Sequence, residues 1–198
     1  MVLPQVIRTD TENTTDGERL LEGKTINLRI MEKEDFSLFQ QWVNNPEFIS
    51  GFMSPIQRSR VELEKFEGSP LAPKIFIVEK KDGSKIGIIV HYHSYLSMDE
   101  LLEIGYAIAP DERGKGYCTE ATLLMVDYLF LSKDVSRIQA ATSTNNKGSQ
   151  RVLEKAGFTI EGTIRKHVRG ARRDVYLYSI LREEWKEPKI LTRTEKKQ

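Results

Sequence analysis

The sequence predicts a single domain of the α/β (α+β) class, built on a mixed, mostly antiparallel sheet of about seven strands flanked by about four helices. Three observations predict it. The chain has 198 residues, 39% of them hydrophobic and 30% charged, which suits one domain with a sizeable core. Strand and helix patterns alternate along it, and neither an internal repeat nor a low-complexity segment interrupts them. We expect the folded domain to span residues 23–185.

The two ends are expected to lie outside this domain. Residues 1–22 are polar and predict a flexible extension, although a strand or hairpin added to the core is an open alternative. Residues 186–198 form a polar tail. The first residues lack the basic start and the long apolar core of a signal peptide.

Composition narrows the class of protein. The formal net charge of +1 gives no bulk argument for binding nucleic acid or a membrane. No apolar run approaches the roughly 20 residues of a membrane span. The single cysteine, Cys118, makes an internal disulfide impossible, which favours a reducing cytoplasmic location.

The first elements follow from local pattern. Residues 25–30 alternate polar and apolar and predict a strand. Residues 34–44 have helical spacing, and Pro46 ends that helix because the residue before proline avoids the α region. Residues 47–55 then form a loop. Its apolar side chains either line an acceptor groove or fill a gap beneath the loop; they are Phe48, Phe52 and Met53.

A helix over residues 59–66 is followed by three strands in a meander. Residues 74–79 and 85–95 are the first two, joined by a hairpin turn with Asp82-Gly83 at its centre. Residues 101–109 form the third strand, which Pro110 stops because proline cannot donate to a ladder.

A glycine-rich basic turn, residues 113–116, separates the third strand from a helix that starts near Thr119. Such a turn aims backbone N–H groups and the positive end of the helix dipole at one point, which suits a phosphate. A connection whose glycines serve only the turn is the open alternative. The turn is neither a Walker A loop nor a dinucleotide fingerprint.

The last elements are a strand over residues 136–143, a helix over 145–156 that ends at Gly157, and strands over 158–168 and 174–181. The turn between these two strands, residues 165–173, holds five Arg or Lys side chains. Such a run is a solvated surface, or attracts an acidic acceptor or RNA.

The turn resembles the pyrophosphate-binding motif of the GCN5-related N-acetyltransferases (GNAT). That motif is Arg or Gln, two free positions, Gly, one free position, then Gly or Ala; here Arg113, Gly116 and Cys118 occupy it, so the last position departs from the pattern. The segments 103–106 and 113–117 are similar to the RimJ/RimL-like branch, which acetylates ribosomal proteins. A second match is Asn-x-x-Ser at Asn146 and Ser149, about thirty residues downstream of the turn.

The resemblance implies a GNAT fold, whose sheet is splayed in the middle between the strands at 103–109 and 136–143. It also implies acetyl-CoA as co-substrate, with its pantetheine arm between the parted strands, and no metal. The acetyl group would pass directly to a primary amine. Backbone groups from Gly105 onward would pair with pantetheine.

The resemblance also implies roles for individual residues. Glu103 would be the general base, directly or through water, and Ser149 would act near the leaving sulfur. The plain alternatives are an exposed strand carboxylate and a helix-surface hydroxyl. A backbone N–H near Ala107 or Ile108 would polarise the carbonyl. The residues expected to contact the phosphates or the rest of the coenzyme are Arg113, Gly114, Lys115, Gly116, Tyr117, Cys118, Thr119, Asn146 and Ser149.

Some of these residues have a second interpretation. Thr119 and Asn146 are also candidates for helix N-caps. At a helix N-terminus the Cys118 thiolate would be favoured, so the residue is either a redox sensor or a small side chain chosen for fit. His91, His93 and His167 lack accompanying ligands and predict no metal site.

The implied acceptor is a protein N-terminal α-amine, and a polyamine, an amino acid or an amino sugar is the alternative. A non-catalytic sensor that binds coenzyme A is a rival from a different class. We expect a monomer or homodimer that binds neither a membrane nor, directly, nucleic acid.

Overall fold

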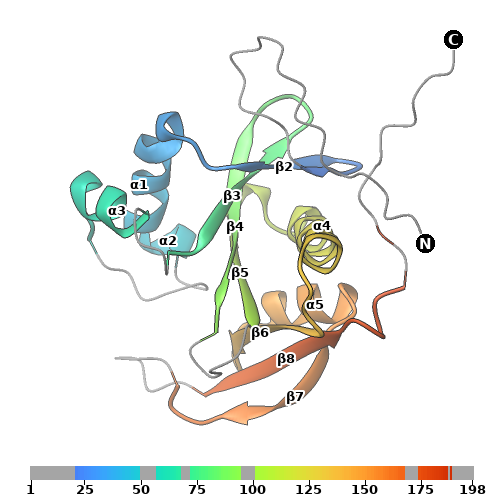
Figure 1. Ribbon diagram of the computed structural model, residues 1–198. Helices are drawn as coiled ribbons and strands as arrows, with labels where there is room; N and C mark the ends of the chain where they lie inside the picture. Colours follow the sequence, from blue (N-terminus) through green and yellow to red (C-terminus); the bar gives the residue numbers. More distant parts are fainter. Residues whose placement is uncertain are drawn as a thin grey trace, which may run out of the picture.

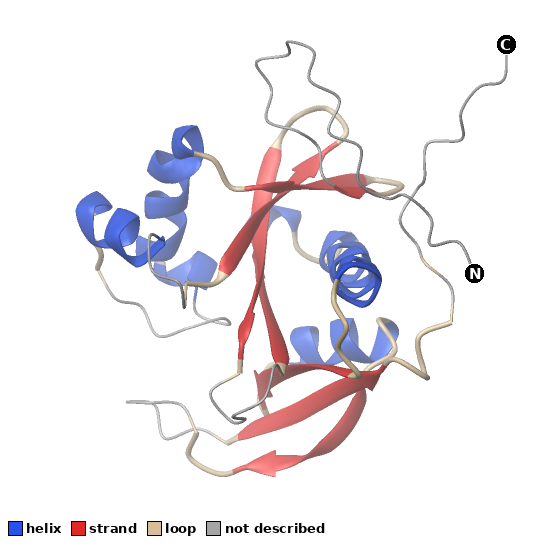
Figure 2. Ribbon diagram, viewed as in Figure 1, coloured by secondary structure: helices blue, strands red, loops and turns tan. Residues whose placement is uncertain are grey.

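The computed structural model describes residues 21–49, 57–67, 72–94, 101–167, 174–186 and 188. They form one eight-stranded sheet in the order β1-β2-β3-β4-β5-β6-β8-β7 (Figures 1 and 2). The strands are β1 (Leu21–Glu22), β2 (Ile26–Ile30), β3 (Lys74–Lys80), β4 (Lys85–His93), β5 (Leu102–Ile108), β6 (Arg137–Ser143), β7 (Thr159–Ile164) and β8 (Val175–Leu181). The α-helices are α1 (Phe36–Asn44), α2 (Pro46–Ile49), α3 (Arg60–Glu67), α4 (Tyr117–Ser132) and α5 (Lys147–Lys155). Two 3-10 turns, η1 (Lys33–Asp35) and η2 (Pro110–Glu112), precede α1 and α4.

The pairing of strands confirms the predicted mixed, mostly antiparallel sheet. Every neighbouring pair is antiparallel except β5 and β6, which are parallel. The β3–β4 hairpin turns at Gly83, which has a φ of +87° that favours glycine. The strand that was not among the seven predicted is β1, whose Leu21 lies opposite Leu28 of β2. The last two residues of the predicted extension are therefore part of the sheet, and residues 1–20 lie outside the described residues.

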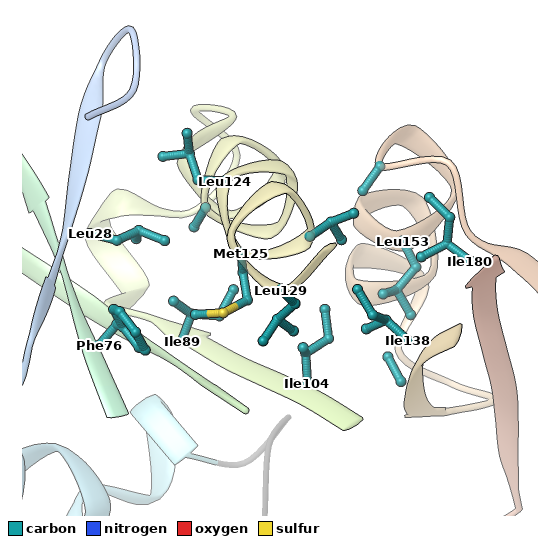
Figure 3. Packing of buried hydrophobic residues seen from close by; sticks show 14 of the residues in the cluster. Leu28, Phe76, Ile89, Ile104, Leu124, Met125, Leu129, Ile138, Leu153 and Ile180 are labelled. Carbon is teal, nitrogen blue, oxygen red and sulfur yellow. The ribbon is translucent and has the colours of Figure 1, made fainter. Parts of the chain in front are cut away.

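Helices cover both faces of the sheet (Figure 1). Helices α4 and α5 pack on one face, over a core that Figure 3 shows from close by. That core includes Leu28, Phe76, Ile89, Ile104, Leu124, Met125, Leu129, Ile138, Leu153 and Ile180. Helices α1, α2 and α3 pack on the other face with a second cluster, which includes Phe36, Phe39, Val43, Phe48, Leu63, Ile77, Ile88 and Ala107. We call these two sides the α4 face and the α1 face.

A buried ion cluster fixes the start of α1 against the sheet. Arg29 in β2 donates to both carboxylate oxygens of Asp35, at 2.8 and 2.9 Å. Lys85 in β4 donates to the same carboxylate at 2.6 Å, and the backbone N–H of Glu32 donates at 2.9 Å. Because the Asp35 side chain is only 1% exposed, these donors replace the water it has lost.

The segment after α1 differs from its prediction. Residues 47–55 were expected to be a loop, but Pro46–Ile49 form the short helix α2. Phe48 is buried and stacks on Trp42, with ring centroids 5.0 Å apart. Of the two alternatives for this side chain, filling space beneath the segment is therefore correct for Phe48, whereas Phe52 and Met53 lie outside the described residues.

Two other boundaries differ. Helix α4 begins at Tyr117 rather than near Thr119, because Gly116 with a φ of +90° is its N-cap. Strand β7 ends at Ile164 rather than at residue 168. Of the basic turn, residues 165–173, positions 168–173 lie outside the described residues.

The chain after β8 packs back on α4. Arg182 donates to the backbone carbonyls of Phe130, Lys133 and Val135, at 2.6 to 2.8 Å. The indole N–H of Trp185 donates to buried Asp127 at 2.7 Å. The bonds to Phe130 and Lys133 satisfy carbonyl groups at the C-terminus of α4, which have no partner within the helix.

Candidate active site

The sheet opens between β5 and β6. The two strands pair only at Leu102 with Ile138 and at Glu103 with Gln139. Beyond these positions β5 continues to pair with β4 through Ile108, while β6 continues to pair with β8. The predicted splay is therefore present, and the β5 backbone from Ile104 to Ile108 has no ladder partner on the β6 side.

A cavity of about 50 Å³ lies at this opening. Its lining comes from β4, β5, β6 and α5, and consists of Tyr92, Ile104, Gly105, Tyr106, Ala140, Ala141, Ser149 and Leu153. None of these side chains carries a charge at neutral pH. The cavity connects the open β5 edge with α5, so a chain-like ligand that paired with β5 would pass Ser149.

Ser149 is held by a tyrosine from the open strand. The Oγ of Ser149 lies 2.9 Å from the hydroxyl oxygen of Tyr106, and that hydroxyl also donates to the backbone carbonyl of Ser149 at 3.2 Å. Burial raises the pKa of the Tyr106 phenol well above its ordinary value, so the phenol keeps its proton. The two hydroxyls form a pair that can hold and pass a proton.

Glu103 is the centre of a polar network at the point where the strands part. Its Oε1 accepts from the Tyr92 hydroxyl at 2.8 Å, and its Oε2 accepts from Ser94 at 3.1 Å and from the Gln139 amide at 2.9 Å. Gln139 also donates to Ser94, at 2.8 Å. Glu103 is therefore not the freely exposed strand carboxylate of the alternative reading.

Glu103 and Ser149 lie on opposite sides of the sheet. Side chains alternate along a strand, and in β5 Ile104 and Tyr106 pack with the α4-face core whereas Ala107 packs with the α1-face cluster. Glu103 is four positions before Ala107, an even number, so its side chain lies on the same α1 face. A group bound in the opening would thus have a carboxylate on its α1 side and a hydroxyl pair on its α4 side.

The turn before α4 presents free backbone to solvent. Gly114 and Gly116 have φ values of +77° and +90°, and a Cβ at either would meet nothing within 4 Å. These glycines let the chain enter the N-terminus of α4, where the first N–H groups have no partner within the helix. This geometry fits the phosphate role predicted for the turn.

The two cations of the turn have protein partners. Lys115 donates to Glu112 at 2.8 Å, and Lys80 donates to the same carboxylate at 3.3 Å. The Lys115 and Lys80 ammonium groups together keep the pKa of Glu112 below its ordinary value, against the opposing effect of desolvation. Arg113 donates to three backbone carbonyls, those of Ile108, Glu47 and Phe48.

Three further predicted contact residues have defined surroundings. Thr119 lies inside α4, so its N-cap interpretation is wrong. Asn146 is the N-cap of α5 and accepts from the backbone N–H of Ser149 at 3.0 Å. Cys118 is half-buried, and burial raises the pKa of its thiol to about 12, although Arg113 acts in the opposite direction. The pKa shift therefore runs against the expected thiolate, because desolvation outweighs the opposing charge of Arg113.

Comparison with known proteins decides the family. Residues 25–159 match the acetyltransferase (GNAT) domain. The chain belongs to the GNAT family of N-acetyltransferases.

Relatives and solved structures agree with this assignment. The chain is 32% identical over 165 residues to the probable N-acetyltransferase YjcK of Bacillus subtilis, covering 76% of this chain and 89% of that protein. It is 35% identical over 106 residues to the putative ribosomal N-acetyltransferase YdaF of the same organism, covering 52% and 57%. The crystal structure of Vibrio cholerae spermidine N-acetyltransferase with CoA and spermine superposes with a TM-score of 0.71 at 25% identity, covering 81% and 97%.

Family membership confirms two of the predictions. The protein is a GNAT N-acetyltransferase, and its co-substrate is acetyl-CoA. Among the described residues, no group of three or more His, Cys, Asp or Glu side chains could hold a metal ion. In the same part of the chain, no helix has the length and apolar character needed to cross a membrane.

Sequence reasoning missed the partners of the two predicted catalytic residues. These are Tyr106 beside Ser149, and Tyr92, Ser94 and Gln139 around Glu103. Tyr106 lies in the segment 103–106 that carried the family resemblance, three residues from Glu103. Tyr106 lies two positions after Ile104, and residues two apart on a strand face the same side. This spacing could have placed Tyr106 on the same face as the apolar Ile104.

Proposed function

We propose that this GNAT enzyme transfers the acetyl group of acetyl-CoA directly to the N-terminal α-amine of a protein. The observation that supports this acceptor is the carboxylate of Glu103 at the edge of the opening between β5 and β6, next to a cavity whose lining is uncharged. A polyamine carries several cations, and each buried cation needs an anionic partner. A single α-amine followed by neutral peptide groups needs only one carboxylate, which Glu103 supplies at the edge of the opening.

In this proposal the glycine turn and strand β5 bind different parts of acetyl-CoA. The backbone N–H groups at residues 114–118 would bind the diphosphate, with Lys115 as a nearby cation. The edge of β5 that faces the opening, from Gly105 to Ile108, would bind the amides of the pantetheine arm, and an N–H at Ala107 or Ile108 would polarise the thioester carbonyl. Lys115 would exchange Glu112 for phosphate, or bind both.

Proton transfers on the two faces of the sheet would accompany acyl transfer. The amine nitrogen attacks the thioester carbonyl from the α1 side, and its proton passes through water to Glu103. A C–N bond forms as the C–S bond breaks, and the thiolate takes a proton from Ser149 on the α4 side. Tyr106, kept protonated by burial, holds the Ser149 Oγ in place by their hydrogen bond, and the Ser149 oxygen regains its proton from water.

A small polyamine is the second candidate acceptor. The specific support for it is the fold similarity to the Vibrio cholerae enzyme, whose crystal structure contains spermine. The name of YdaF supports a ribosomal acceptor instead. A cytoplasmic location, where either acceptor would be found, stays a prediction from the single cysteine.

The test is thiol release from acetyl-CoA with a matched panel of acceptors. The panel contains a short alanine-initiated peptide, the same peptide with an acetylated N-terminus, spermidine and an amino sugar. We expect the free peptide to give the largest kcat/KM and the blocked peptide to give none. A larger kcat/KM with spermidine than with the peptide would contradict the proposed acceptor.

A further inference from the structure

We propose that Arg113 is a positioning residue that joins the cofactor turn to helix α2, so that acetyl-CoA binding sets the position of the α1 face. The motif position that Arg113 occupies predicted a contact with phosphate. In the structure its guanidinium instead binds protein carbonyls. The proposal rests on the proposed function, because that function places the acceptor on the α1 side of the opening.

The Arg113 guanidinium donates hydrogen bonds to three backbone carbonyls. Its Nε donates to Ile108, the last residue of β5, at 3.0 Å. Its Nη2 donates to Glu47 at 2.8 Å and to Phe48 at 3.3 Å. Glu47 and Phe48 belong to α2, which at four residues is too short to satisfy its own carbonyl groups. A guanidinium is the side chain best suited to such a forked set of acceptors.

Helix α2 is coupled to the reaction site through packing. Phe48 stacks on Trp42 of α1, and Ile49 is fully buried. Both belong to the α1-face cluster, which also contains Ala107 of the open strand β5. A shift of α2 would therefore move the layer that lies over the α1 side of β5.

The other side of Arg113 is the glycine turn. Gly114 follows it directly, and Gly114 and Gly116 have the backbone conformations that make the turn possible. When the turn closes on a diphosphate, the backbone of Arg113 is fixed, and its side chain holds α2 in one place. Cofactor binding would thereby tighten the restraint that the hydrogen bonds of Arg113 already place on α2.

Hydrogen exchange of α2 tests the coupling without an acceptor. The amides of Glu47, Phe48 and Ile49 are suitable probes because each donates to Asn45. In the wild type we expect acetyl-CoA to slow their exchange by about tenfold, the factor that corresponds to one hydrogen bond to a charged group. In Arg113→Met this slowing should disappear, while residues 114–118 are still protected. Arg113→Lys should restore part of it.

Kinetics provide the second readout. Arg113→Met should raise the KM for the amine acceptor about tenfold and change the dissociation constant of acetyl-CoA less than threefold. Lys115→Met is the matched control in the same turn, and it should weaken acetyl-CoA binding in a salt-dependent way without changing the exchange of α2.

Two results would overturn the proposal, and a third would overturn only the proposed function. Equal protection of α2 by acetyl-CoA in wild type and Arg113→Met would show that Arg113 does not couple the two segments. A loss of acetyl-CoA affinity of thirtyfold or more in Arg113→Met, suppressed at high salt, would make Arg113 a phosphate ligand instead. Tight acetyl-CoA binding and α2 protection with no turnover of any amine would contradict the proposed function alone.

Discussion

The hydroxyl of Tyr106 in β5 lies 2.9 Å from the Oγ of Ser149 in α5, although 43 positions separate the two residues. The contact spans the opening of the sheet from its strand side to its helix side. Burial keeps the Tyr106 phenol protonated, so it stays a hydrogen-bond partner that fixes the position of Ser149. In the proposed mechanism this hydroxyl pair faces the leaving thiolate.

The hydroxyl pair should act as a unit. Tyr106→Phe retains the ring and its packing, so kcat should fall about 10- to 100-fold while the dissociation constant of CoA changes little. Ser149→Ala should cost at least as much in kcat. The double variant should be no worse than Ser149→Ala, because removing the serine already breaks the relay. Steady-state thiol release and calorimetric CoA binding measure these effects, and fully additive losses would argue against a relay.

Glu103→Gln tests the carboxylate at the point where β5 and β6 part. We expect kcat to fall about 100-fold, because an amide cannot accept the proton. Acetyl-CoA affinity should stay within about threefold. Tyr92→Phe removes one donor to Glu103 but leaves the carboxylate, so it should lower kcat far less. A Glu103→Gln enzyme with unchanged turnover would show that Glu103 only stabilises the point where β5 and β6 part.

The Asp35 cluster should make stability depend on acid. Burial would raise the pKa of Asp35, but hydrogen bonds from Arg29, Lys85 and the backbone of Glu32 outweigh it and lower the pKa from 3.8 to about 2. A lowered folded-state pKa stabilises the protein above pH 4, and this contribution, about 2 kcal/mol, is lost as the pH falls from about 4 to 2.

Asp35→Asn should therefore remove most of that acid dependence. At pH 7 it should also lower the free energy of unfolding by about 3 kcal/mol, because Arg29 loses the closer of its two carboxylate partners. Urea unfolding at several pH values measures both effects, with Asp111→Asn on the surface of η2 as the control. An Asp35→Asn protein that lost as much stability between pH 4 and pH 2 as the wild type would contradict this account.

Cys118 should be unreactive in the folded protein. With its thiol pKa at about 12, the thiolate fraction at pH 8 is on the order of a thousandfold below that of an ordinary cysteine. Alkylation by iodoacetamide should be correspondingly slow in buffer and fast in denaturant. Equal rates in the two conditions would indicate a thiolate at the start of α4 and revive the redox interpretation.

Much of the fold was predictable because its signals are local. The Asp82-Gly83 hairpin, the cap at Asn146 and the left-handed Gly157 each depend on a few neighbouring residues, and each is where it was expected. Helix α2 could not be found in the same way. Its four residues have no helical propensity signal, and contacts with Arg113, 65 and 66 positions away, supply carbonyl partners.

The site was predictable in part, for the same physical reason. Glu103, Ser149 and the glycine turn lie in segments with family-like spacing. The partners of these residues depend on which strands lie side by side and which face each side chain occupies. Gln139 reaches Glu103 only because β6 pairs with β5 at that position, and the pKa of Cys118 is raised by burial, which the sequence alone does not reveal.

The most direct test of the central claim is the amide NMR spectrum of ¹⁵N-labelled protein during titration with acetyl-CoA. If the diphosphate binds the turn and the pantetheine arm enters the opening between β5 and β6, the resonances of Gly105, Gly114 and Gly116 should shift together. Gly83, in the β3–β4 hairpin, should not shift. Changes at Gly114 and Gly116 without any at Gly105, at saturating acetyl-CoA, would mean that the thioester does not enter the opening.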